Sequence, residues 1–102
     1  MKVEKHSFVI KTKQPPQIEF DAAARAFYVR FKRAKITRTL SQEAERSHIT
    51  IDLDEKGEVV GIEAIGVDNF SIDTVLKMAR TTAPNINFAR ARFSPTEELV
   101  EA

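Results

Sequence analysis

The stretch His48-Ile-Thr-Ile-Asp-Leu-Asp-Glu-Lys-Gly-Glu-Val-Val-Gly-Ile-Glu-Ala-Ile65 predicts a β-hairpin, around which the rest of the chain can be arranged. Apolar and polar residues alternate before Asp54, as in a strand with one buried face. Residues 54–57 predict a tight loop, because Gly57 can take the left-handed conformation that ends such a loop. The loop sets a register with one apolar and one polar face. In that register Leu53 faces Glu58, Ile51 faces Val60, Ile49 faces Ile62, and on the polar face His48 faces Glu63, Thr50 faces Gly61 and Asp52 faces Val59.

Length and composition limit the class of protein. The chain has 102 residues, which predicts a single domain over residues 1–102. It has no cysteine, which excludes disulfides and thiolate metal sites. Sixteen basic and fifteen acidic residues give a net charge of +1, which disfavours a partner recognised by overall charge, such as duplex DNA or an anionic membrane. No apolar run approaches the roughly 20 residues of a membrane span, and the N-terminus lacks the apolar run of a signal peptide. We therefore expect a soluble, cytoplasmic protein.

Further extended segments are predicted before the hairpin. Residues 6–12 predict a short strand with Phe8 and Ile10 on one face, and the prolines at 15 and 16 end it because they have no amide donor. Residues 18–20 are extended, and residues 21–25 predict a turn. Residues 26–32 predict a clear strand, since Phe27, Val29 and Phe31 alternate with polar side chains.

Residues 35–40 are expected to return beside residues 26–32, with Ile36 opposite Phe31 and Leu40 opposite Phe27. This pairing leaves Arg38 opposite Val29, on an apolar face. A bulge or an edge position would resolve the conflict, and the sequence does not choose between them.

The C-terminal third predicts helices. Residues 71–82 carry an amphipathic stripe of Ile72, Val75, Leu76 and Ala79, with Ser71 as N-cap, Asp68 as its rival, and Pro84 ending the helix. Residues 86–93 predict a further strand, and residues 95–101 a short C-terminal helix that Ser94 caps. The predicted fold class is α+β: a mostly antiparallel β-meander or sheet, with one amphipathic helix on one face.

Four segments together resemble a known family: Ile18-Glu-Phe-Asp21, Ala26-Phe-Tyr-Val-Arg-Phe31, Thr37-Arg-Thr39 and the stretch from Ile51 to Glu63. In this order they resemble the domain of unknown function 2283, over residues 17–65. Phe20 and Arg25 depart from the family's pattern, where a tyrosine and an acidic residue are expected. The resemblance implies a β-rich unit and no known activity. Some relatives resemble small partners of neighbouring toxin-like proteins.

Two constellations could carry chemistry but have simpler interpretations. His48 and Glu63 face each other, as a carboxylate that orients a histidine would, yet no nucleophile completes a site, so we interpret them as a surface polar pair. The segment from Asp52 to Gly57 partly follows a calcium-binding loop. Its fifth ligand position is Lys56, and its flanks predict strands, so turn chemistry explains it better. We expect no catalytic residue, metal or cofactor.

The densest cluster of basic residues lies around residues 30–38. Five cations in nine residues, with an aromatic side chain beside them, are typical of a nucleic-acid-binding surface; the candidates are Tyr28, Arg30, Lys32, Arg33, Lys35 and Arg38. In a simple meander, however, this loop lies at the same end of the sheet as Asp54, Glu55 and Glu58, so that mutual neutralisation is the favoured interpretation.

The sequence therefore predicts a non-enzymatic protein-interaction module, homodimeric, with a possible small protein partner of the toxin-like class. Phe88, Phe93 and the N-terminal strand are candidates for completing the homodimer, by edge pairing or by exchange of terminal segments. The first alternative is a nucleic-acid-binding or regulatory protein that uses residues 30–38. The second is an enzyme that uses His48 and Glu63.

Overall fold

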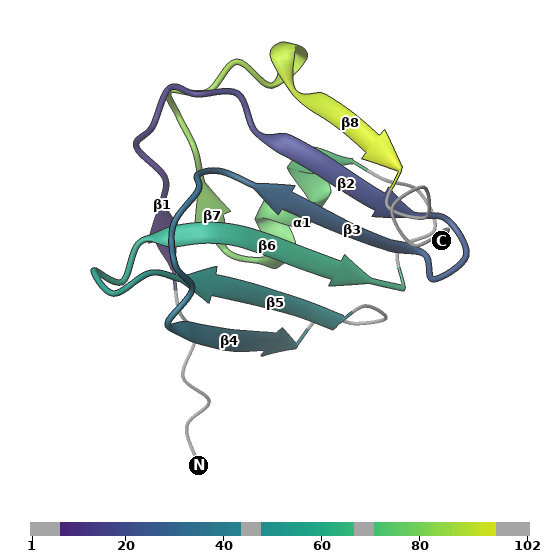
Figure 1. Ribbon diagram of the computed structural model, residues 1–102, viewed down its shortest axis with the longest axis horizontal. Coiled ribbons are helices and arrows are strands. Elements are labelled where there is room, and N and C mark those ends of the chain that lie inside the picture. Colours follow the sequence, from purple (N-terminus) through teal and green to yellow (C-terminus); the bar gives the residue numbers. More distant parts are fainter. Residues whose placement is uncertain (1–6, 44–47, 67–70, 96–102) are drawn as a thin grey trace.

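The protein has an α+β fold built on a six-stranded mixed sheet, and the computed structural model describes residues 7–43, 48–66 and 71–95 (Figure 1). The strand order is β4-β5-β6-β3-β2-β8. The bounds of these strands are Gln17–Asp21 for β2, Ala26–Arg30 for β3, Arg38–Glu43 for β4, His48–Leu53 for β5, Val59–Ile65 for β6 and Arg92–Pro95 for β8.

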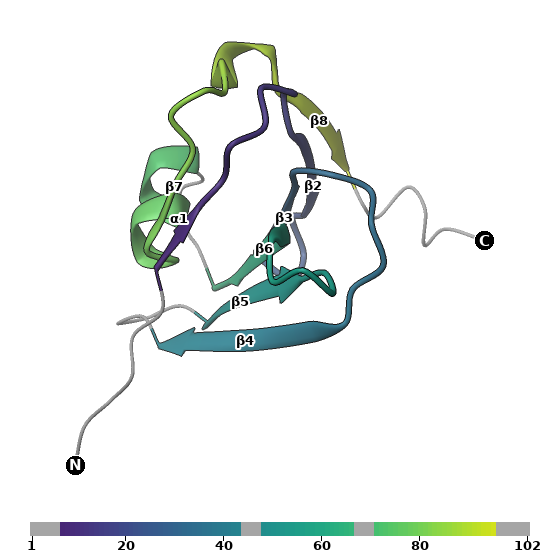
Figure 2. The same ribbon diagram turned by 90° about the vertical axis from the view of Figure 1, so that its left-hand side faces the viewer.

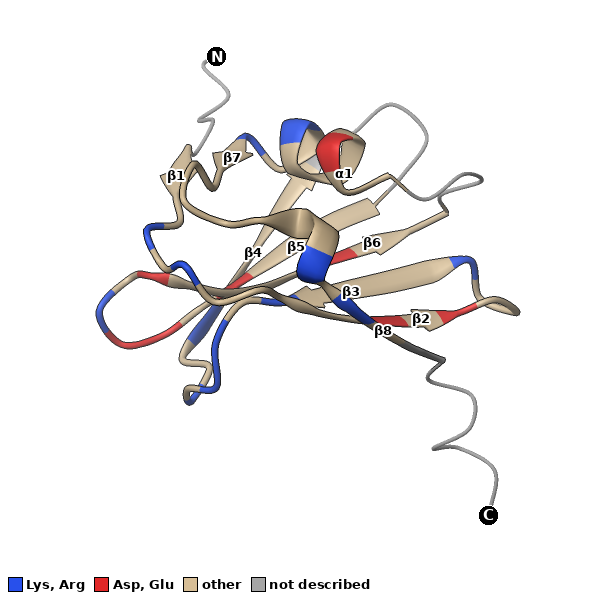
Figure 3. Ribbon diagram, turned by 90° about the horizontal axis from the view of Figure 1, so that it is seen from above, with Lys and Arg blue, Asp and Glu red and all other residues tan. Residues whose placement is uncertain are grey.

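A second layer covers one face of this sheet; on the other face, called the open face below, no helix or strand of the described residues lies (Figures 2 and 3). The layer consists of the helix α1 (Ile72–Met78) and a small parallel pair, β1 (Phe8–Val9) with β7 (Thr81–Thr82). A 3-10 turn, η1 (Phe88–Arg90), leads from this layer to β8. The core lies between the layers and is formed mainly by buried aliphatic side chains, among them Ile18, Val29, Ile49, Ile51, Ile62, Ala64, Val75 and Ala79.

The predicted hairpin forms, but its register differs from the prediction. Ile51 faces Ile62 rather than Val60, and Ile49 faces Ala64 rather than Ile62. One residue of this displacement comes from an irregularity between Asp52 and Leu53: Leu53 pairs with Val59, whereas Asp52 pairs with Gly61. Gly57 ends the turn in a left-handed conformation as predicted, with φ +80° and its amide donating to the carbonyl of Asp54. The turn is one residue longer than predicted, since it places Leu53 opposite Val59 rather than Glu58. The alternation predicted the faces of residues 48–53 and 61–65 correctly, because the displacement there is two residues and preserves them. At the start of β6 the predicted faces are wrong, since Val59 and not Val60 lies on the core face with Leu53.

The predicted pairing of residues 35–40 with residues 26–32 is wrong. β3 lies between β2 and β6, and the chain then crosses the ends of β6 and β5 to place β4 at the edge of the sheet (Figure 1). β4, β5 and β6 with β3 thus form a Greek key instead of a simple meander. The arrangement puts Val29 opposite Ile62 and Arg38 opposite Leu53 in the edge strand, where the arginine side chain is exposed. The edge position resolves the conflict that Arg38 posed.

The sheet is mixed, whereas a mostly antiparallel sheet was predicted. β8 runs parallel to β2, with Ile18 opposite Phe93. The predicted first strand, residues 6–12, is short and pairs with β7 in the second layer, not with the main sheet. In both cases the partner strand comes from the other end of the chain, which local periodicity cannot reveal.

The predicted helix of residues 71–82 is shorter in the structure, α1 ending at Met78. Ser71 is its N-cap, as predicted, and its hydroxyl accepts from the amide of Thr74. Arg80 has φ +55°, a left-handed conformation that ends the helical path before Pro84 is reached. The two threonines that follow then pair as β7, which suits their branched side chains.

The predicted C-terminal elements also differ. Residues 86–93 contain η1 and only the start of a strand, because the side chain of Asn87 caps the turn by accepting from the amide of Ala89. A short helix was predicted over residues 95–101. Its first residue, Pro95, instead ends the strand β8, and residues 96–101 lie outside the described residues. Pairing with β2 outweighs the capping pattern at Ser94, since a strand beside a buried neighbour gains ladder hydrogen bonds and packing.

Candidate anion-binding pocket

A row of three side chains crosses the open face where β3 ends and where β2 and β8 begin. Gln17 is paired with Arg30 on one side and with Arg92 on the other, so these three side chains share a face. The amide of Arg92 donates to the carbonyl of Pro16, which anchors the start of β8. An open pocket of about 740 Å³ lies here, lined by Gln14, Pro15, Pro16, Gln17, Arg30, Phe31, Lys32, Arg33, Arg90 and Arg92.

The lining is positively charged. Five of its residues are basic and none is acidic, although the chain as a whole carries nearly equal numbers of both kinds. The basic residues come from three parts of the chain, which Figure 3 shows in blue: β3 with the loop after it, η1 and the start of β8. Of these, Arg33, Arg90 and Arg92 form no side-chain hydrogen bond or ion pair with any residue that the structure describes. The pocket therefore has unbalanced positive charge.

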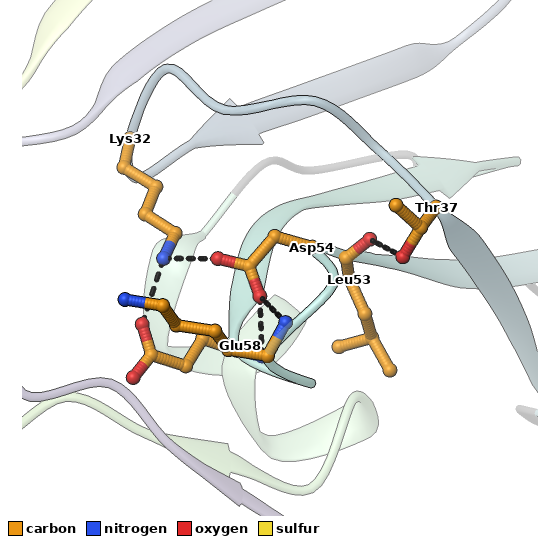
Figure 4. Close-up of polar contacts among 6 residues, drawn as sticks. Lys32, Thr37, Leu53, Asp54 and Glu58 are labelled. Carbon is orange, nitrogen blue, oxygen red and sulfur yellow. Dashed lines mark hydrogen bonds and ion pairs between the residues drawn. The ribbon is translucent and has the colours of Figure 1, made fainter.

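Lys32 is the pocket cation with the shortest ion pairs among the described residues (Figure 4). Its Nζ lies 2.5 Å from Asp54 Oδ2 and 2.7 Å from Glu58 Oε1, so the loop after β3 is tied to the β5–β6 turn. The hydrogen bond from Lys32, followed by those from the backbone amides of Glu58 and Lys56, lowers the pKa of the Asp54 carboxyl to about 2. The same two carboxylates raise the pKa of Lys32. The predicted mutual neutralisation thus holds for Lys32.

Tyr28 is engaged within the sheet and does not offer a stacking surface to the pocket. Its hydroxyl donates to Asp52 Oδ2 at 2.7 Å, and its ring reaches that carboxylate across Gly61. The guanidinium carbon of Arg30 lies 5.0 Å from the ring centroid, a cation–π distance. Burial, followed by the hydrogen bond to Asp52, raises the pKa of the Tyr28 phenol above its usual value. Arg30 also lies 4.0 Å from a carboxylate oxygen of Glu19.

The other predicted basic residues lie away from the row. Lys35 lies in the loop after β3, and Arg38 begins the edge strand β4. Both are exposed, and neither side chain forms an ion pair within residues 7–43, 48–66 and 71–95. The predicted cluster of residues 30–38 is therefore divided: Arg30, Lys32 and Arg33 line the pocket, with Lys32 paired to carboxylates, whereas Lys35 and Arg38 lie outside it.

His48 and Glu63 do not face each other as predicted. His48 is opposite Ile65 and Thr50 is opposite Glu63, so the two side chains are diagonal neighbours on the open face. No hydrogen bond joins them in the described part of the chain. The displaced register explains the difference.

The open face beside the pocket is acidic rather than basic. A second hollow, of about 510 Å³, is lined in part by the carboxylates of Glu19, Asp21, Asp52 and Glu63. In the described residues no group of three metal-ligating side chains comes together. The basic pocket and this hollow thus lie side by side, with Arg30 in the lining of both.

Arg90 and Arg92 are the pocket residues that sequence reasoning missed. The sequence shows the two arginines one residue apart in Arg90-Ala-Arg92, but no local pattern indicates that this segment pairs with β2. The parallel pairing of β8 with β2 is what adds these charges to Arg30 and Arg33.

A family model, described as a protein of unknown function (DUF2283), matches residues 17–67, half of the chain. The chain belongs to the DUF2283 family. The matched segment of this DUF2283 protein begins with β2 and includes β3, β4, β5 and β6. Arg90 and Arg92 lie outside it, as do α1 and the β1–β7 pair. Comparison with curated proteins and with solved structures found no match. The described helices are also too short to cross a bilayer.

Proposed function

We propose that this DUF2283 protein is a non-enzymatic interaction module that binds an acidic segment of a partner protein in the basic pocket. The observation that carries the proposal is the pocket lining, which has five basic residues and no acidic one. A carboxylate-bearing segment would supply the counter-charge that Arg33, Arg90 and Arg92 lack within the described structure, through charge-assisted hydrogen bonds.

The surroundings of the pocket favour a short acidic segment over a long polyanion. The carboxylates that line the neighbouring hollow would repel a phosphate backbone that continued along the open face. Tyr28 is held by Asp52 and covered by Arg30, and Phe31, which lines the pocket, is buried, so neither ring is available to stack on a base. A small toxin-like protein, the partner class that the family resemblance implied, is compatible with this mode of binding. Homodimerisation and a cytoplasmic location remain predictions.

Nucleic-acid binding is the second candidate, and one observation favours it. Arg33, Lys35 and Arg38 are exposed and have no acidic partner among the described residues, so they could extend the pocket into a basic track. Such a track would bind phosphates by charge, without the stacking that many single-stranded complexes use.

The test compares two fluorescent probes by anisotropy at several salt concentrations: a short oligoglutamate peptide and a single-stranded oligothymidylate of equal charge. We expect the peptide to bind, and the double variant Arg90→Gln, Arg92→Gln to bind it about tenfold more weakly or worse. Lys77→Gln removes a charge on α1, away from the pocket, and is the matched control. Tighter binding of the oligothymidylate would favour the second candidate, and equal loss in Lys77→Gln would refute a defined pocket.

A further inference from the structure

The strand β8 is an edge of the main sheet. It pairs with β2 on one side, and on its other side no strand lies beside it among the described residues. An open edge presents backbone N–H and C=O groups that can pair with an incoming strand. The basic pocket adjoins this edge, since Arg92 belongs to both β8 and the pocket lining.

The two faces of β8 present different chemistry. Arg92 is in the row with Gln17 and Arg30 on the open face, where the charge is positive. Phe93 lies on the opposite face, next in register to the fully buried Ile18, yet it is 55% exposed. Successive side chains of an added strand would meet these two environments in turn. Charge and apolar surface therefore alternate along the edge.

We propose that β8 is the docking edge for an extended segment of the partner protein, whose acidic and apolar side chains alternate. The added strand would pair with the β8 backbone, its acidic side chains lying beside Arg92 and the pocket and its apolar side chains covering Phe93. This inference rests on the proposed function, because it names the form in which the acidic partner reaches the pocket. Strand addition also supplies main-chain hydrogen bonds that an acidic loop would not make.

The opposite edge of the sheet does not present the same pattern. β4 begins with Arg38, which does not belong to the pocket lining. An acidic strand added there would lie beside Arg38 but away from the basic pocket. Charge complementarity thus selects β8.

The test uses blocked peptides of about eight residues. One peptide alternates glutamate and valine, and the other has the same composition with all glutamates first. Two further versions of the alternating peptide carry backbone N-methyl groups, one at every valine and one at every glutamate. In an added strand the amide groups of the valines point to one side and those of the glutamates to the other, so only one of these two groups of amides faces β8. A slip of one residue would bring glutamate side chains onto the Phe93 face.

Isothermal titration calorimetry should show that the alternating peptide binds more tightly than the block peptide. One N-methylated version should lose about tenfold or more in affinity, and the other should retain it. Phe93→Thr should weaken the alternating peptide selectively, whereas Lys77→Gln should not. Because the methylated peptides are tested on the unaltered protein, this result does not depend on whether a variant folds.

Two outcomes separate this inference from the proposed function. If the alternating and block peptides bind equally and neither methylation matters, strand addition is refuted while the anion-binding pocket stands. If neither peptide binds, the pocket proposal fails, and the docking edge fails with it.

Discussion

Gly61→Ala tests the contact that organises the open face. A Cβ atom placed on Gly61 would lie 2.5 Å from Cε2 of Tyr28 and closer still to its Cζ and hydroxyl oxygen. The ring cannot simply tilt away, because its hydroxyl is bonded to Asp52 and Arg30 lies over its face. Asp52 is itself held by the hydroxyl of Thr39, at 2.6 Å. We expect the alanine to displace Tyr28.

The expected size of the effect follows from what is lost and gained. Losing a hydrogen bond to a charged acceptor costs about 1.5–3 kcal/mol, and losing a cation–π contact at a partly exposed site about 0.5–1 kcal/mol. Replacing a strand glycine by alanine returns about 0.5–1 kcal/mol, since alanine loses less backbone entropy on folding. Gly61→Ala should therefore lower the free energy of unfolding by about 2 kcal/mol.

The double-mutant cycle with Tyr28→Ala provides the decisive comparison. Without the ring, only the backbone entropy of Gly61 matters, so Gly61→Ala should stabilise the Tyr28→Ala variant by roughly 0.5 kcal/mol or more. Urea unfolding followed by circular dichroism measures all four proteins. The reasoning is refuted if the alanine has the same effect with and without the Tyr28 ring.

Other predictions concern single positions. The pKa of Asp54 is lowered to about 2, so the contribution of this carboxylate to stability is complete above its unfolded pKa near 3.8 and is lost as the pH falls towards 2. The urea midpoint of Asp54→Asn should therefore change less over this pH range than that of the unaltered protein. Arg80→Gly should raise the free energy of unfolding by about 0.5–1 kcal/mol, because glycine accepts the positive φ without strain, and no rise in thermal midpoint would contradict this. Gln42→Met removes a buried hydrogen bond to the Ala79 carbonyl and should cost about 1 kcal/mol, a loss that calorimetric unfolding can measure; an unchanged midpoint would show that this bond contributes nothing net.

Side-chain alternation predicted which face of a strand is buried better than it predicted which strands lie next to each other. The apolar sides of β3 and β5 were predicted correctly, because a period of two directly reports burial on one side of a strand. The order of the strands depends on which ones must be central. β6 is buried at most of its positions and takes a place between β5 and β3, which the local pattern of residues 35–40 could not indicate.

The candidate site was predicted in part for the same reason. Arg30, Lys32 and Arg33 were identified from local charge density, and Lys32 meets Asp54 and Glu58 as anticipated. The contributions of Arg90 and Arg92 depend on a parallel pair between segments far apart in the sequence. Ser94-Pro95 carries a helix-capping pattern, and this local signal concealed the strand that brings both arginines to the pocket.

The origin of the second layer has a consequence for synthesis in the cell. Strands β2 to β6 are complete once residue 65 has been made, whereas α1, β7 and β8 follow later. At about 5–20 residues per second, the apolar side chains of Ile49, Ile51 and Ile62 would remain uncovered on the ribosome for on the order of seconds. In that interval the nascent sheet presents the kind of surface that chaperones bind, and the arrival of α1 and β7 covers it.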